Sequence, residues 1–337
     1  MKCAQIERTG WDQDLVIHEH ESRAPVRSEI KVRVQACGVC YRDCIDRSGQ
    51  FAFINPPVTP GHEAVGEVIE LGPDASAFEV GDRVASMHRD YCGECQACGE
   101  GQTSLCLFAA NVLGLLVNGG YAEEMVAPEK CFYPIPKEIP ASDAAILHCT
   151  FGTAYRGIMR AGELKPESKV LITGANGGVG HAAIQIAKRL GAFVIAVARQ
   201  EAHREWLAEL GADQVIIDTE GRFHKQISSP VDLVLDCVGE PTFNASLRSV
   251  NVGGALVLIG NVTPERAALN LGFVITRGIK IVGSSGATPN DMKKVVQLYQ
   301  EQPFTTHIQH EWPLEKADQA QRLIQSGGQK GRIVIKP

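Results

Sequence analysis

The residues VLITGANGGVGHAAIQIAKRLG (170–191) join a short apolar stretch to a longer periodic one through a loop rich in glycine. VLIT is typical of a short buried strand, and the segment after the loop predicts a helix, since its apolar residues recur on one face. That face is formed by Val179, Ala182, Ala183, Ile186, Ala187 and Leu190. Gly191 follows at the position where helices commonly end.

The loop carries Gly174, Gly177 and Gly180 at a spacing of three, with Gly178 and Val179 between them. Glycines at such positions let the backbone approach a pyrophosphate, which then lies at the positive end of the helix dipole. Because the loop stands between a strand and a helix, the pattern predicts dinucleotide binding. The alternative is a tight turn that binds nothing.

The residues at the end of the next strand, FVIAVA (193–198), are those that distinguish NAD from NADP in this type of fold. Chains that bind NAD usually place Asp or Glu there, bonded to the ribose 2′-hydroxyl. This chain has Ala198 followed by Arg199, and an arginine can hold a 2′-phosphate with two hydrogen bonds. We therefore predict NADP(H) rather than NAD(H), unless Arg199 is a solvated surface residue or stacks on the adenine.

Strands and helices alternate downstream, which predicts parallel βαβ units and a doubly wound sheet in an α/β protein. The expected elements are a helix over 201–210, strands at 214–218 and 232–237, a helix over 242–249, and strands at 255–260 and 278–283. The last fifty residues are expected to hold one helix, over 315–326, and a final strand, RIVIK.

Residues 1–150 are rich in short strands. EIKVRVQA alternates apolar and polar residues, while EAVGEVIELG and GDRVAS are bounded by glycine, proline or aspartate. These segments predict a separate β-rich domain.

Composition excludes several classes of function. The 337 residues are 44% hydrophobic, which is enough for a sizeable core. Their formal net charge is −6, so the chain lacks the excess of basic residues that nucleic-acid or anionic-membrane partners require. It contains no apolar run of 18 residues, and the N-terminal segment MKCAQIERTG is too polar for a signal peptide. We expect a cytoplasmic protein that acts on a small molecule.

Four of the eleven cysteines crowd into YCGECQACGEGQTSLC (91–106). Cys92, Cys95, Cys98 and Cys106 have the spacing C-x2-C-x2-C-x7-C, and four thiolates on one small loop suit a tetrahedral, closed, structural zinc ion. Spacing alone leaves an iron–sulfur cluster open. A nucleic-acid zinc ribbon is disfavoured by the acidic balance.

A second metal site would draw ligands from distant segments. Cys40, the pair His62 and Glu63, and Cys149 lie in CGVC, PGHEAVG and AAILHCTFGTAY, and a Cys–His–Cys set with one open position suits a catalytic zinc. Taken singly, Cys149 and His62 also fit a packed core. The remaining cysteines are expected to be packing residues or free thiols: Cys3, Cys37, Cys44, Cys131 and Cys237.

Nearly the whole chain resembles the zinc-containing medium-chain dehydrogenase/reductase superfamily, of the alcohol dehydrogenase type. The resemblance is carried by CGVCYRD, PGHEAVGEV, FEVGDRV, the four-cysteine segment, LHCTFGTAY, TGANGGVG and GRIVIKP. It implies a GroES-like catalytic domain over 1–150 and 286–337, a Rossmann domain over 151–285, and an active site in the cleft between them. It also implies a homodimer or homotetramer joined at the edge strand GIKIVG.

The resemblance further implies two zinc ions per chain. Cys40, His62 and Cys149 would hold the catalytic ion, with Glu63 near the metal and Asp43 orienting His62. Arg332 would lie near the cofactor phosphates.

Alcohol oxidation needs a path for the hydroxyl proton, and the chain departs from the family there. Members commonly have Ser or Thr two residues after the first zinc cysteine and His five residues after it, whereas this chain has Arg42 and Ile45. Arginine stays protonated in proteins, and isoleucine carries no exchangeable proton. Either Tyr41 or a bound water supplies the hydroxyl, or the reaction does not interconvert alcohols and carbonyls.

The last option has support, because CGVCYRD, GEPTFNASL and LIGNVTP also resemble archaeal acryloyl-coenzyme A reductases. Such enzymes add hydride to a C=C bond and a proton to carbon, so they need no hydroxyl relay. Arg42 would then contact an anionic substrate group or the cofactor phosphates, or else pair with a neighbouring acid and hold its loop. The leading prediction remains an NADP(H)-linked alcohol dehydrogenase or carbonyl reductase, with the C=C reductase as the alternative and a non-catalytic nucleotide sensor as a third. The stretch 107–120 is expected to contribute to the substrate pocket.

Overall fold

The computed structural model describes residues 1–50, 54–162 and 164–337. The chain divides into two units. The first comprises Met1–Cys149, Ala287–Gln297 and His307–Pro337, and the second comprises Thr150–Gly286 and Leu298–Thr306. The segment Leu298–Thr306 thus belongs with the central part of the chain, although it lies beyond residue 285.

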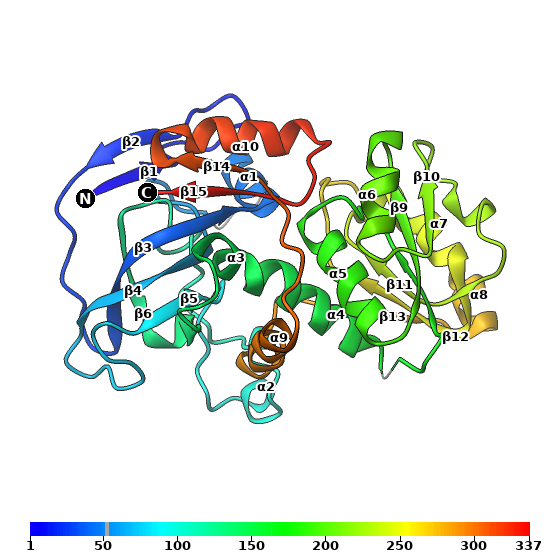
Figure 1. The fold of residues 1–337 in the computed structure, drawn as a ribbon, viewed down its shortest axis with the longest axis horizontal. Helices are drawn as coiled ribbons and strands as arrows, with labels where there is room; N and C mark the ends of the chain where they lie inside the picture. The colour runs from blue at the N-terminus through cyan, green and yellow to red at the C-terminus, as the bar shows by residue number, and fades with distance from the viewer. Residues whose placement is uncertain (51–53, 163) are drawn as a thin grey trace. The chain divides into compact units, whose positions relative to one another are not determined.

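The second unit contains a six-stranded parallel sheet in the order β10-β9-β8-β11-β12-β13. Counted along the chain this is the order 3-2-1-4-5-6 of the dinucleotide-binding fold, so the predicted doubly wound sheet is confirmed. Its strands are β8 (Lys169–Ile172), β9 (Phe193–Ala198), β10 (Gln214–Ile217), β11 (Val231–Asp236), β12 (Val250–Leu258) and β13 (Lys280–Gly283). Figure 1 labels β9, β10, β11, β12 and β13 of this sheet.

Helices connect these strands, as the alternation predicts. The connecting helices are α5 (Gly178–Arg189), α6 (Arg204–Glu209), α7 (Glu240–Ser249) and α8 (Leu271–Arg277), with 3₁₀ turns at Glu201–His203 before α6 and at Phe223–Lys225 between β10 and β11. Helix α4 (Thr153–Ala161) precedes β8. The predicted apolar face of α5 is buried at its centre, where Ala182, Ala183 and Ile186 lie. Gly191 has a φ of +79°, the left-handed conformation that ends a helix.

The first unit is built on a seven-stranded sheet in the order β14-β15-β3-β4-β5-β7, with β6 also paired to β3. Its strands are β3 (Glu29–Val39), β4 (Glu63–Leu71), β5 (Arg83–Ser86), β6 (Glu124–Pro128), β7 (Phe132–Pro134), β14 (Ile308–Pro313) and β15 (Arg332–Lys336). A separate hairpin pairs β1 (Lys2–Gln5) with β2 (Val16–Glu19). Ile30, Val32, Val34 and Ala36 of β3 are buried, which confirms the alternation seen in EIKVRVQA.

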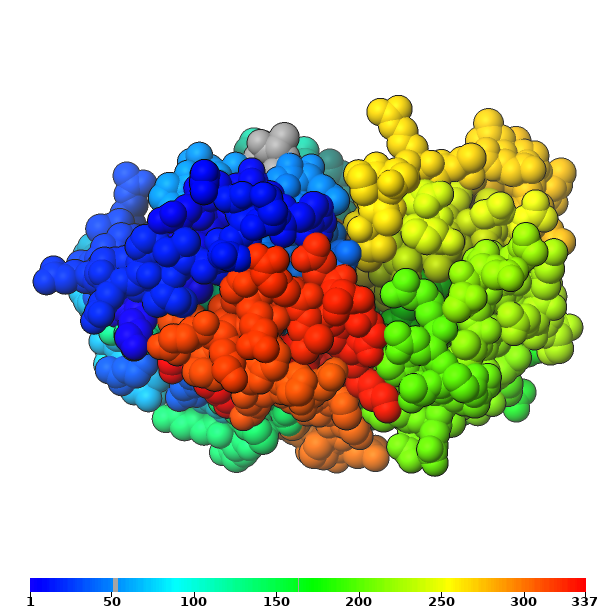
Figure 2. Space-filling model, turned by 90° about the horizontal axis from the view of Figure 1, so that it is seen from above, coloured from blue at the N-terminus to red at the C-terminus, as the bar shows by residue number. Residues whose placement is uncertain are grey.

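Both ends of the chain contribute to this unit. Figure 2 shows the N-terminal segment in blue against the C-terminal segment in orange and red, and Lys2 Nζ lies 3.2 Å from Glu315 Oε1. Strand β15 pairs antiparallel with β3, so that Ile333 faces Val39. This pairing sets the start of β15 beside the end of β3, where Cys40 follows.

The helices that lie wholly within the first unit are short. They are α1 (Tyr41–Ser48), α2 (Gln96–Gly99), α3 (Ala141–Ile146) and α10 (Ala317–Ser326), with 3₁₀ turns at Thr103–Leu105, Glu129–Cys131 and Leu314–Lys316. A π-helical turn, Leu147–Gly152, follows α3 directly. No helix in the described ranges is both long enough and apolar enough to cross a membrane.

The expectation of one helix and one strand in the last fifty residues is wrong. The segment also holds α9 (Pro289–Glu301) and strand β14. The start of α9 is stabilised by a capping box, in which Asp291 N–H donates to Thr288 Oγ1 (3.2 Å) and Thr288 N–H donates to Asp291 Oδ2 (2.8 Å). The pattern T-x-x-D at 288–291 is the sequence signal that would have revealed this helix.

Candidate metal centre and nucleotide site

Four side chains from three separate segments of the first unit come together. The ligand atoms of Cys40, His62, Glu63 and Cys149 all lie within 4.8 Å of one another, and the two sulfurs are 3.9 Å apart. Cys40 is the N-cap of α1, His62 immediately precedes β4, and Glu63 begins β4. Cys149 lies in the π-helical turn. Such turns are rare in proteins, and those that occur are often found at functional sites.

His62 is held by Asp43, which is completely buried. His62 Nδ1 lies 2.9 Å from Asp43 Oδ1, and Asp43 Oδ2 accepts hydrogen bonds of 3.1 Å from the Cys40 backbone N–H and from the Tyr121 hydroxyl. An imidazole fixed in this way by a carboxylate presents its other nitrogen to a metal. No local sequence pattern points to Tyr121, because it lies 78 positions from Asp43 along the chain.

Glu63, a member of this cluster, is paired with Arg332. Arg332 Nη2 donates to Glu63 Oε1 at 2.8 Å, and it is 3.7 Å and 3.8 Å from the sulfurs of Cys40 and Cys149. A Cβ at Gly38 would come within 2.5 Å of Glu63 Oε2, so glycine leaves the room that this carboxylate occupies. Arg332 therefore balances the negative charge of the cluster, while its role toward cofactor phosphates stays a prediction.

The pKa values of this cluster are strongly shifted. The hydrogen bond from Cys149, opposed by burial and aided by Arg332, lowers the pKa of Cys40 well below that of a free thiol. Burial raises the pKa of Glu63 to about 7. Burial and Arg42 lower the pKa of His62, but Asp43 outweighs them and raises it to about 10.

Two thiols, an imidazole and a carboxylate around one point fit the ligand chemistry of zinc. Because zinc needs deprotonated ligands, its binding would release the protons that this cluster holds.

The residues that follow Cys40 face different surroundings. Arg42 Nε donates to Asp46 Oδ2 (2.9 Å) and Nη2 donates to the Leu113 carbonyl (3.0 Å), which joins α1 to the 107–120 segment. Ile45 is 7% exposed, and Tyr41 is half-buried against the core of the unit. Arg42 thus pairs with a neighbouring acid, one of the arrangements that the sequence left open.

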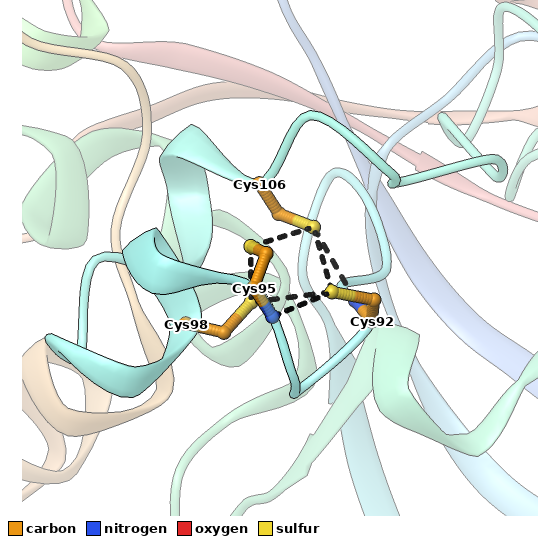
Figure 3. A group of neighbouring side chains, drawn as sticks. All are labelled: Cys92, Cys95, Cys98 and Cys106. Carbon is orange, nitrogen blue, oxygen red and sulfur yellow. Dashed lines mark hydrogen bonds between the residues drawn. The ribbon is translucent and has the colours of Figure 1, made fainter.

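The four cysteines of 92–106 form a second cluster (Figure 3). The sulfur pairs Cys92–Cys98, Cys95–Cys98, Cys95–Cys106 and Cys92–Cys106 are 3.9, 3.5, 3.9 and 3.6 Å apart. Zn–S bonds of about 2.3 Å in a tetrahedron place the sulfurs about 3.8 Å apart. The spacing therefore fits a single ion, whereas an iron–sulfur cluster would hold the sulfurs farther apart.

Backbone N–H groups stabilise the thiolate form of Cys92 in this four-cysteine lobe. The N–H groups of Glu94 and Cys95 donate to Cys92 Sγ at 3.4 and 3.3 Å, and they lower the pKa of Cys92 to about 6. Lys130 Nζ donates to the Cys92 carbonyl at 3.0 Å, and Arg89 donates to the Cys106 carbonyl. The two cations join the lobe to the rest of the unit.

The glycine loop in the second unit has the geometry of a phosphate site. Gly174 has a φ of +58°, and Gly177 is the N-cap of α5, which begins with Gly178, Val179 and Gly180. A Cβ at Gly180 would lie 2.3 Å from the Gly174 carbonyl oxygen, so only glycine lets the helix approach the loop this closely. The start of α5 can receive a pyrophosphate at its dipole.

Asp236, to which no sequence motif points, links several segments of this region. It is completely buried and accepts hydrogen bonds from the Thr173 hydroxyl (3.0 Å) and the N–H groups of Val238 and Gly239 (2.9 Å each). The hydroxyls of Thr242 and Ser246 also donate to it. One carboxylate therefore links the end of β8 to the turn after β11.

Ala198 is buried at the end of β9, and Arg199 after it is exposed. No carboxylate stands at these two positions to repel a 2′-phosphate. Of the cysteines outside the two clusters, Cys3, Cys37, Cys44 and Cys131 are fully buried and Cys237 is half-buried. All five are free thiols, as predicted.

Comparison with known proteins gives concordant results. The family model for the alcohol dehydrogenase GroES-like domain matches residues 26–137, and that for zinc-binding dehydrogenase matches residues 178–301. An acryloyl-coenzyme A reductase of Sulfurisphaera tokodaii is 36% identical over 329 residues, which cover 97% of this chain and 98% of the relative. An alcohol dehydrogenase of Geobacillus stearothermophilus is 33% identical over 343 residues, covering 100% and 99%.

Among solved structures, the thermostable alcohol dehydrogenase from Pyrobaculum aerophilum with bound cobalt and zinc superposes with a TM-score of 0.91. It shares 30% sequence identity, and the match covers 100% of this chain and 99% of that one.

Proposed function

Because this chain belongs to the zinc-containing medium-chain dehydrogenase/reductase superfamily, we propose that it uses NADPH to reduce an activated C=C bond, such as that of an α,β-unsaturated acyl thioester. The observation that carries the proposal is Arg42 beside the metal cluster, in the position where relatives that oxidise alcohols place a hydroxyl. Its guanidinium is held by Asp46 and Leu113, and Ile45 is buried. Neither Arg42 nor Ile45 can relay a proton from a substrate hydroxyl, which suits a reaction whose proton is added to carbon.

The metal cluster suits a substrate with a carbonyl group that a bound metal ion could polarise. Cys40, His62 and Cys149 would hold zinc, with Glu63 near the metal, and Cys92, Cys95, Cys98 and Cys106 would hold a second zinc. When bound, the catalytic zinc supplies a Lewis acid and NADPH supplies hydride. Asp43 keeps the His62 ring oriented, and Arg332 keeps the carboxylate of Glu63 charge-balanced.

Matched substrates test the proposal. We expect the zinc-loaded protein to oxidise NADPH with acryloyl-coenzyme A and to show little turnover of benzaldehyde at the same concentration. The measurement is the loss of NADPH absorbance, with product analysis to show a saturated thioester. Turnover of the aldehyde alone would reject the C=C assignment.

A second candidate is the NADP(H)-linked interconversion of an alcohol and a carbonyl compound. It is favoured by the Cys–His–Cys set, which suits a zinc-bound alkoxide, and by the relatives named alcohol dehydrogenase. Tyr41 or a bound water would then supply the missing hydroxyl. The assay with benzaldehyde and benzyl alcohol decides between the two.

We expect Arg199→Ala to raise the KM for NADPH by roughly tenfold to a hundredfold, because a charged hydrogen-bond pair to the 2′-phosphate is lost. The KM for NADH should stay within about twofold, since NADH lacks that phosphate. Steady-state kinetics with both cofactors measure the ratio. Arg248→Ala is the control, because Arg248 is exposed at the far end of α7. Equal use of the two cofactors by the unaltered protein would contradict the preference.

We also propose a homodimer or homotetramer. Strand β13 forms one edge of the six-stranded sheet, and Leu271 and Ile275 of the neighbouring helix α8 are 64% and 76% exposed. An apolar surface beside an unpaired strand edge suits pairing with a second copy. Light scattering in solution measures the mass, and a monomer at micromolar concentration would contradict this assignment.

A further inference from the structure

Arg42 offers one fixed edge and one open edge. Its inner edge is held by the hydrogen bonds from Nε to Asp46 and from Nη2 to the Leu113 carbonyl. The Asp46 side chain is fully buried, so this anchor does not swing with solvent. Two contacts on a planar guanidinium fix the direction in which its remaining N–H groups point.

The outer edge is available to a ligand. Nη1 of Arg42 makes no hydrogen bond within residues 1–50, 54–162 and 164–337, and 23% of the side chain is exposed. Arginine keeps its charge at every physiological pH, so this edge presents fixed donors for a planar oxyanion. Holding the loop alone would not require the outer edge to face solvent.

Helix α1 places Arg42 next to two residues, one of the metal cluster and one of its support. Arg42 is on the first turn of α1, two residues after Cys40. Cys40 is the N-cap of that helix, and Asp43, which follows Arg42 directly, lies 2.9 Å from His62 Nδ1 through its Oδ1 atom. A substrate atom held at the proposed ligands would lie within the field of Arg42.

We propose that the Nη1 edge of Arg42 binds an oxyanion of an α,β-unsaturated acyl substrate, and that it thereby selects such substrates over simple alcohols. The inference rests on the proposed function and specifies its substrate class. Hydride from NADPH adds to the β-carbon, the π-electron pair moves toward the carbonyl oxygen, and a proton from solvent adds to the α-carbon, leaving NADP⁺ and a saturated acyl group. The oxyanion is either that carbonyl oxygen as it gains charge or a carboxylate on the acyl chain.

Arg42→Gln tests the contact, because glutamine can still donate to Asp46 or Leu113 but carries no charge. With the zinc-loaded protein we expect kcat/KM for acryloyl-coenzyme A to fall by roughly tenfold to a hundredfold, the effect of losing a charged hydrogen bond. Arg42→Lys should recover part of the loss. Arg33→Gln, which changes an exposed arginine on β3, should leave kcat/KM unchanged.

A substrate that bears a second, free carboxylate, the mono-coenzyme A thioester of butenedioic acid, separates the two sources of charge. If kcat/KM of Arg42→Gln falls with both thioesters, the contact is assigned to the carbonyl oxygen. If it falls with the dicarboxylic substrate alone, the contact is assigned to the carboxylate on the acyl chain. Values of kcat/KM within twofold of the unaltered protein for both thioesters would overturn the inference and leave Arg42 as a loop anchor.

Binding of acrylate to the NADP⁺ complex, followed by calorimetry, gives a readout that needs no turnover. We expect acrylate to bind the unaltered protein at least tenfold more tightly than Arg42→Gln. If the unaltered protein reduces neither thioester, the proposed function fails, and acrylate affinity alone then decides the inference. Equal affinity for the two proteins would overturn it.

Discussion

Replacing Cys149 by alanine is expected to lower the zinc content from two ions per chain to one and to reduce kcat/KM by roughly a thousandfold. Cys149 Sγ lies 3.9 Å from Cys40 Sγ and belongs to the four ligand atoms that lie within 4.8 Å of one another. Removing one thiolate leaves His62 and Cys40 without a third strong ligand. A Lewis acid contributes several kcal/mol at the transition state, which corresponds to about three powers of ten in rate.

Cys44→Ala is the matched control for this change. Cys44 is also a buried cysteine of the first unit, but its sulfur faces the Gln321 carbonyl (3.4 Å) and lies outside the ligand set. Zinc should remain at two ions per chain in this variant. Metal analysis by mass spectrometry measures both proteins, and a zinc content of two in Cys149→Ala would show that Cys149 is not a ligand.

Cys98→Ala is expected to release the other zinc ion and to unfold the lobe at 92–106 locally. The lobe has little apolar packing of its own: α2 contains no buried residue, and Leu105 is 39% exposed. Its order would therefore depend on the metal, whose binding energy acts as folding energy in small zinc modules. Without zinc, repulsion and solvation of the remaining thiolates favour the open loop.

Limited proteolysis with a protease that cuts after glutamate reports this opening, because Glu94 and Glu100 lie inside the lobe. We expect cleavage there to accelerate by at least about tenfold in Cys98→Ala, since protection falls with the local stability of the segment. Cys131→Ala removes a buried cysteine outside the lobe and should leave both the zinc content and the cleavage rate unchanged. Resistance of Cys98→Ala equal to that of the unaltered protein would mean that packing, not metal, orders the lobe.

The features that the sequence predicted well are encoded in short segments. The four-cysteine lobe spans 15 positions, from Cys92 to Cys106, and the glycine loop is contained between one strand and one helix. Over so short a distance, residue spacing and backbone geometry limit what the chain can do. Even the anchor of Arg42 is local, since Asp46 lies four residues further along α1.

Residue types suggested Cys40, His62, Glu63 and Cys149 as possible ligands, but the sequence could not show that they meet in space, and Arg332 was named only through the family resemblance. Cys40 and Cys149 are 109 residues apart, and Arg332 is 269 residues from Glu63, so no periodicity connects them. The sheet brings them together: pairing of β15 with β3 sets Arg332 beside Cys40, and the π-helical turn after α3 turns Cys149 toward them. Such contacts depend on how whole strands pair.

Tyr121, Asp236 and the Leu113 carbonyl belong to the same class. Each one fixes a polar group of a site, Asp43, Thr173 and Arg42 respectively, and none stands in a recognisable motif. Burial is the reason that these partners exist, because an unpaired polar group inside a protein costs free energy that a hydrogen bond recovers. The sequence by itself determined the fold class, the four-cysteine segment and the glycine loop between β8 and α5. Only the tertiary structure decided which buried groups satisfy one another and which edge of Arg42 is left for a ligand.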